Sequence, residues 1–134
     1  MSKGVSSLFD ELGGEAALRR IVDRFVDRMA GDLMIGFLFS RANLARLKEK
    51  EYEFAAQHLG AQVEYSGRPL EVAHRAHQIF DGQFDRRLTL LRETLDAFGA
   101  PARVRAHWLA HTESLRPQIT LGACSEPSPS ERRS

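Results

Sequence analysis

The sequence places one histidine, His74, in the middle of an apolar helix face. Leu70, Ala73, His74 and His77 recur at intervals of three and four residues, which is the spacing of one face of an α-helix. A neutral imidazole in such a position donates one ring N–H to a backbone carbonyl and offers its other nitrogen to a metal ion. The alternative is a half-buried core histidine whose hydrogen bonds are satisfied, and the pattern taken alone favours it.

Glu51 is a carboxylate in an otherwise apolar helix stripe. The stripe consists of Leu44, Leu47, Glu51, Phe54, Ala55 and His58. Because an ionised carboxylate that faces a core is costly, Glu51 must be paired, protonated or directed into a ligand cavity. The alternative is that its side chain turns to the edge of the helix and meets an arginine or a lysine.

Three further histidines are weaker candidates for chemistry. His107 and His111 are spaced i, i+4 and could bind a divalent ion together with a third ligand from elsewhere. The pattern favours a different interpretation, in which His111 faces the core beside Trp108 and His107 is solvated. His58 comes late on its helix, where we expect a solvated cation near the C-terminal end of the helix dipole.

Aromatic side chains are numerous enough to enclose a flat cofactor. At helical spacing such residues more often form an ordinary core. The candidates are Phe25, Phe37, Phe39, Phe54 and Phe84.

The composition limits the function classes. The chain has 134 residues, which fits one compact domain. Its 19 basic and 18 acidic side chains nearly cancel, so the protein has no strong positive potential that would attract nucleic acid or an anionic membrane. The single cysteine, Cys124, excludes a disulfide framework, a cysteine-rich zinc site and an iron–sulfur cluster. No C-x-x-C-H occurs, so a haem would be held non-covalently. No apolar run is long enough to span a bilayer, and the N-terminus lacks the apolar core of a signal peptide, which indicates the cytoplasm.

The elements that must position these residues are all helical. We expect a short turn over 7–12, helices over 15–30 and 42–59, and a corner over 33–39 between them. After a loop over 61–68 come a short helix over 69–78, a break at Gly82, a helix carrying residues 84–98 and a last helix that begins at Pro101 and has Pro117 near its end. The prediction is one domain over 1–121 and a disordered tail over 122–134.

In this order the motifs resemble those of the truncated haemoglobins, the short bacterial globins, from Leu8 to about Ile119. The matching pieces are L-F-D-E-L-G-G at the start, Phe39 at the end of the corner, R-L-K-E-K-E-Y-E-F, L-G-A-Q-V-E-Y-S-G-R-P-L and L-E-V-A-H. The resemblance, strongest to the compact first group, implies an all-α fold with two helices stacked over two around a non-covalent haem b. It places His74 on the iron-ligating histidine. It also implies that Phe39, Leu47, Lys50, Phe54, Leu70, His77, Ile79 and Phe84 contact the cofactor.

The implied distal pocket, formed by Phe25, Val26, Leu47 and Glu51, departs from the family pattern. Val26 falls where the family typically has a tyrosine whose hydroxyl hydrogen-bonds the bound ligand. Glu51 falls where glutamine is frequent, and a carboxylate donates a hydrogen bond only when it is protonated. The resemblance therefore implies weak stabilisation of oxygen.

The resemblance implies a globin that reversibly binds oxygen, nitric oxide or carbon monoxide, as a monomer or weak homodimer. Dioxygenase, peroxidase-like or nitrite chemistry with an unidentified reductase is left open. Two alternatives remain. One is a haem-based sensor, a haem carrier or an interaction domain that binds no gas, and the other is a helical metal-binding protein that uses His107 and His111.

Overall fold

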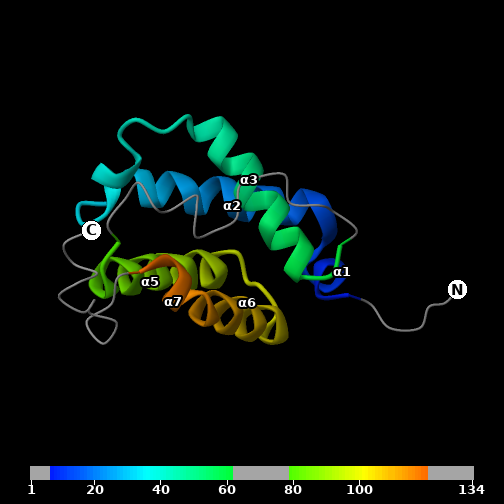
Figure 1. Ribbon diagram of the computed structural model, residues 1–134. Helices are drawn as coiled ribbons and strands as arrows, with labels where there is room; N and C mark the ends of the chain where they lie inside the picture. The colour runs from blue at the N-terminus through cyan, green and yellow to red at the C-terminus, as the bar shows by residue number, and fades with distance from the viewer. Residues whose placement is uncertain (1–6, 62–78, 121–134) are drawn as a thin grey trace, which may run out of the picture.

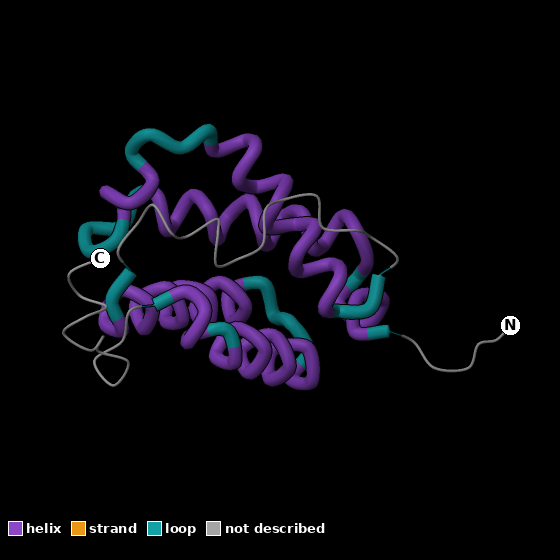
Figure 2. Tube along the Cα trace, in the orientation of Figure 1, coloured by secondary structure: helices purple, strands orange, loops and turns teal. Residues whose placement is uncertain are grey.

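The computed structural model describes residues 7–61 and 79–120, and within these ranges the chain forms helices and no strands. Figures 1 and 2 show two pairs of helices, one formed by α2 and α3 and the other by α5 and α6. The elements are α1 (Leu8–Leu12), α2 (Gly14–Ala30), the 3₁₀ turn η1 (Gly36–Phe39), α3 (Leu44–His58), α5 (Asp81–Ala97), α6 (Ala102–Ser114) and α7 (Arg116–Ile119). No described helix is long and apolar enough to cross a membrane.

Several helix ends follow from their capping residues. The hydroxyl of Ser7 accepts a hydrogen bond from the Asp10 amide at 3.0 Å and starts α1. The side chain of Asn43 accepts from the Arg46 amide and starts α3. Gly60 follows the end of α3 with a φ of 104°, a conformation that glycine adopts without a steric cost.

Two predicted helix boundaries are wrong. Gly82 does not break the chain, because it lies in the first turn of α5, where the backbone amides need no partner within the helix. The amide of Phe80, just before α5, instead donates to the Gln83 side chain. The last helix divides: α6 ends at Ser114, and Pro117 lies within the separate short helix α7.

The hydrophobic core lies where α2 meets α3 and α5. The apolar face of α2 is buried in full, with Leu18, Val26 and Met29 at 0% exposure. The other large core side chains are Phe25, Ile35, Tyr52, Leu59, Leu91, Leu95, Val104 and Trp108. The predicted helix over 69–78, the predicted tail over 122–134 and all but the first residue of the predicted loop over 61–68 lie outside the described residues. The division at residue 121 therefore stays a prediction.

Candidate functional site

Glu51 forms an ion pair with an arginine from the opposite pair of helices. The Arg87 Nη2 atom on α5 donates to Glu51 Oε1 at 3.2 Å and to Oε2 at 3.4 Å. Both side chains are 23% exposed, so the pair lies neither in the dry core nor free in solvent. Of the alternatives open to Glu51, the structure shows pairing with arginine.

The guanidinium of Arg87 is held against α2 as well as α3. Its Nη1 atom donates to the Met29 sulfur at 3.3 Å, and its central carbon lies 5.0 Å from the centre of the Phe25 ring. A thioether is a weak acceptor, and an aromatic face attracts a cation. The Nε atom of Arg87 is buried without a hydrogen-bond partner in the described structure. One donor of this cation therefore has a poor acceptor and another has none.

The remaining predicted pocket residues are apolar around this pair. Phe25 and Val26 are buried at 1% and 0% exposure on α2, and Leu47 is half-buried one turn before Glu51. Neither valine nor leucine can donate a hydrogen bond. Arg87 is therefore the donor that contacts the predicted pocket residues Phe25 and Glu51.

Ion pairs one turn before Glu51 tie α3 to α2. Lys48 Nζ contacts Asp23 Oδ1 at 2.7 Å and Asp27 Oδ1 at 2.9 Å on α2. The pKa of Lys48 is raised, and the hydrogen bond to Asp23 is the main cause. Tyr52, Ala55 and Ala56 are buried on the same helix. With α3 fixed on α2 in this way, Leu47, Glu51 and Phe54 remain only partly buried.

The other predicted cofactor contacts differ in burial. Ile79 is 8% exposed just before α5. Phe84 is buried at 1% exposure, with the Arg116 guanidinium 4.6 Å from its ring centre. Phe39 and Lys50 are half-buried. Leu70, His74 and His77 lie outside the described residues, so the predicted iron ligand and its neighbours stay predictions.

The corner between α2 and α3 is tied to α5 by a second ion pair. Asp32 Oδ1 accepts from Arg86 Nη2 at 2.7 Å and from Arg86 Nε at 3.0 Å, while Oδ2 accepts from the amides of Met34 and Ile35. The bonds to Arg86 are the main reason that the pKa of Asp32 is lowered. The corner is therefore anchored beside Arg87, the next residue of α5.

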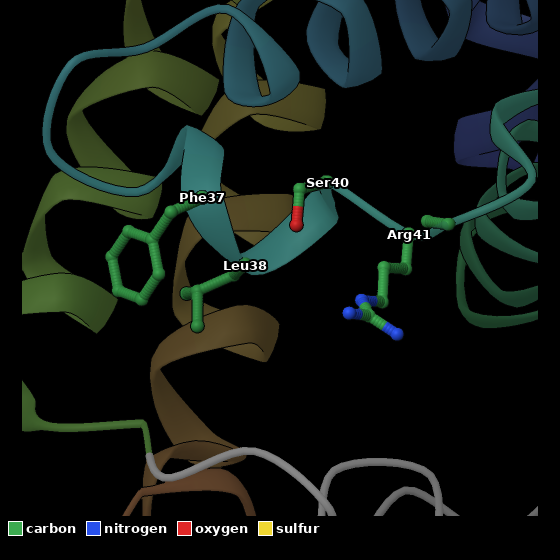
Figure 3. Close-up of a pocket in the computed structure, with 5 residues that line it drawn as sticks. Phe37, Leu38, Ser40 and Arg41 are labelled. Atoms are coloured by element: carbon green, nitrogen blue, oxygen red, sulfur yellow. The ribbon is translucent and has the colours of Figure 1, made fainter.

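A small open pocket lies after this corner. It has a volume of about 190 Å³ and is lined by Phe37, Leu38, Ser40, Arg41 and Ala42. Figure 3 shows the ring of Phe37 and the side chain of Leu38 on η1, with Arg41 extending from the segment that follows. Phe37 is 61% exposed, so it is not a core aromatic residue here. The pocket shares no lining residue with the Glu51–Arg87 pair.

The three described histidines form one cluster between α3 and α6. The rings of His58 and His111 stack with their centres 4.1 Å apart, and the Nε2 atom of His107 donates to the backbone carbonyl of His58 at 3.0 Å. Phe54 packs against His58 and His111, and Trp108 packs edge-on against His58.

Two predictions about these histidines are wrong. His58 is not a solvated cation, because burial, followed by repulsion from His111 and His107, lowers its pKa to about 3. His107 is half-buried against the end of α3 rather than solvated. His111 lies beside the core, as predicted, and burial lowers its pKa. Both errors have one cause, since the pattern of a single helix does not show which other element covers its end.

The three described histidines are not arranged as a metal centre. Within 7–61 and 79–120, no three His, Cys, Asp or Glu side chains are placed to hold a metal ion. The rings of His107 and His111 are nearly parallel, with an interplanar angle of 12°, and His107 Nε2 already contacts a carbonyl. This arrangement argues against a metal-binding protein built on His107 and His111.

Arg87 is the residue that the sequence pattern missed. Phe84, Leu88 and Leu91 form an apolar stripe on α5, and Arg87 lies three residues after the first of them and four before the last. A cation thus interrupts an apolar stripe on α5, as Glu51 does on α3. Opposite charges in the apolar stripes of α3 and α5 therefore could have indicated that the two helices contact each other at Glu51 and Arg87.

The chain is similar in sequence to known globins. The family described as bacterial-like globin matches residues 7–121. The group 1 truncated hemoglobin GlbN of Mycolicibacterium paratuberculosis is 32% identical over 117 residues, which cover 87% of this chain and 86% of that protein.

Solved structures agree with the fold. The hemoglobin of the thermophilic phototrophic bacterium Chloroflexus aurantiacus superposes with a TM-score of 0.77 at 28% identity, over 87% of this chain and 98% of that one. The truncated hemoglobin of Tetrahymena pyriformis in its Fe(III) form superposes with a TM-score of 0.78 over 86% of this chain and 98% of that one. At 22% identity, this second match supports the fold alone.

Proposed function

Because the chain belongs to the bacterial-like globin family, and within it to the group 1 truncated haemoglobins, we propose that it binds haem b non-covalently and binds a diatomic gas there. The observation that carries this proposal is the family match over residues 7–121, nearly the whole chain. The two-on-two arrangement of α2 and α3 over α5 and α6 agrees with it.

The described residues fit such a group. Leu47 and Phe54 stay half-buried on α3, although both are apolar and their helix is well packed on α2. Both lie one turn from Glu51, whose partner Arg87 has a buried Nε donor with no acceptor among the described residues. Such a combination of half-buried apolar side chains and an unpartnered donor is expected where a ligand completes the site. When bound, haem supplies an iron atom with an open coordination position for a diatomic ligand. His74 is the residue that we propose holds this iron.

Most side chains of this pocket are apolar and offer no hydrogen bond to bound oxygen. Phe25 and Val26 present only apolar atoms, and Leu47 does the same from α3. Glu51 accepts hydrogen bonds from Arg87 and is thereby an acceptor rather than a donor. Because the tyrosine typical of the family is replaced by Val26, we propose that oxygen is held weakly.

Absorption spectroscopy tests this proposal directly. Protein produced with a haem supply is expected to show a sharp near-ultraviolet haem band in its ferric, ferrous and carbon monoxide forms. His74→Ala is expected to abolish or severely weaken the band, and His107→Ala, which removes a histidine of α6 that is not among the predicted haem contacts, is the matched control that should keep it. A colourless wild-type protein would refute haem binding. An unchanged spectrum of His74→Ala would refute the proposed ligand, and a haem protein that binds no carbon monoxide would favour a sensor or carrier.

A further inference from the structure

We propose that Arg87 is the hydrogen-bond donor of the distal pocket and makes the pocket selective for a small inorganic anion over a neutral gas. This inference rests on the proposed function, since it assumes a haem beside α3. It adds a residue from a third helix, α5, to a pocket otherwise formed from α2 and α3. It also changes the preferred class of ligand.

The placement of Arg87 supports this role. Its guanidinium contacts Glu51 on α3 and lies over the ring of Phe25 on α2, and these are two of the four residues predicted to form the pocket. Its third contact, Met29, lies one turn after Phe25 on the same buried face of α2. The cation therefore enters the pocket from the opposite pair of helices, at the level of Glu51.

The hydrogen bonds of Arg87 leave capacity for a ligand. Nη2 is engaged by Glu51, but Nη1 has only the Met29 sulfur as acceptor, and Nε is buried with no partner in the described part of the chain. A buried donor without an acceptor is costly, and a charged acceptor relieves that cost more than a neutral one. A small anion can supply the missing acceptor.

Glu51 holds the guanidinium in place through two bonds to one nitrogen, which fixes the side chain on the α3 side of the pocket. The same carboxylate opposes the entry of an anion, because like charges repel. Glu51 is thus a positioning residue whose removal has a predictable sign. Without it, Arg87 presents its full charge to the pocket.

Fluoride binding to the ferric protein tests the proposal. In a spectrophotometric titration with sodium fluoride at constant pH and ionic strength, Arg87→Met is expected to weaken fluoride affinity about tenfold or more. Arg92→Met removes an exposed arginine from the same helix and is the matched control for the change in net charge, expected to stay within about twofold. Carbon monoxide affinity of the ferrous protein should stay within about twofold in both variants. Circular dichroism checks that each variant is folded.

Two further variants keep the proposal falsifiable. Glu51→Gln is expected to raise fluoride affinity at least about threefold, and this gain should shrink when Arg87→Met is added. If Arg87→Met does not retain haem, Arg87→Lys keeps the charge without the Nε donor and should still lose at least about threefold.

Equal fluoride affinity in wild type and in the Arg87 variants would overturn the proposal. So would an equal loss in Arg92→Met, since the effect would then be one of net charge. A wild-type protein without a haem band is a different result, because it refutes the proposed function itself.

Discussion

The histidine cluster between α3 and α6 makes this protein sensitive to acid, and His58 is the main cause. The His58 ring stacks on His111, packs against Trp108, and has its carbonyl bonded by His107, all from α6. Its Nδ1 atom is buried without a hydrogen-bond partner in the described structure. Burial disfavours the charged imidazolium, and the positive forms of His111 and His107 disfavour it further.

The expected loss of folding stability follows from the pKa of His58 in the unfolded and folded states. The pKa of His58 falls from 6.5 to about 3 on folding, so below pH 6.5 the unfolded chain binds a proton that the folded protein does not. Stability is therefore lost as the pH falls from 6.5 toward 3, by up to about 1.36 kcal/mol per pH unit. Between pH 7 and pH 5 this amounts to about 2 kcal/mol, and the partial solvent exposure of His58 reduces it to about 1–2 kcal/mol.

The assay is urea unfolding of wild type and His58→Phe at several pH values. Phenylalanine keeps a flat ring against His111 but cannot take up a proton, so the variant should lose about 1–2 kcal/mol less than wild type between pH 7 and pH 5. Above pH 7 the two free energies of unfolding should run parallel, because neither ring titrates there. Identical pH dependence of wild type and variant would refute the argument from burial.

Two further predictions concern the corner that leads into α3. Gly36→Ala should lower the free energy of unfolding by about 1–3 kcal/mol, because a Cβ atom there would lie 2.6 Å from the Ala30 carbonyl oxygen. Thermal melting checks this prediction. The control is Gly82→Ala, whose Cβ atom meets open space. Asp32→Asn should cost about 1.5–3 kcal/mol at pH 7 by removing the charged partner of Arg86. Since the pKa of Asp32 is lowered on folding, the gap between wild type and Asp32→Asn should close as the pH falls below about 3.8, and a gap that is independent of pH would contradict it.

Local features of this fold were predictable from the sequence because their causes are local. Ser7 and Asn43 cap helices through side chains that reach an amide three residues on, and both caps are present. The buried face of α2 follows from the spacing of its apolar residues, from Leu18 to Met29. In each case, the partner that explains the feature lies within a few residues of it.

Features between distant helices could be predicted only in part. The position of Glu51 on an apolar stripe showed that it needed a partner, but 36 residues separate it from Arg87. His58 was predicted as a solvated cation for the same reason, since its cover comes from α6, about 50 residues later. A stripe specifies which face of a helix is buried and leaves the facing element undetermined.

The identity of the hydrogen-bond donor in the proposed pocket decides which class of ligand the pocket favours. If Val26 takes the place of the tyrosine that the resemblance implies, α2 offers no neutral donor there, whereas Arg87 brings a charged donor from α5 to Phe25 and Glu51. A neutral hydroxyl favours a polarised gas ligand, whereas a guanidinium gains most from a ligand with a full negative charge. A lone cation would be costly in this half-buried place, and the carboxylate of Glu51 offsets part of that cost. The least ordinary position of the sequence, Glu51, is thus explained by the arginine that faces it from the opposite pair of helices.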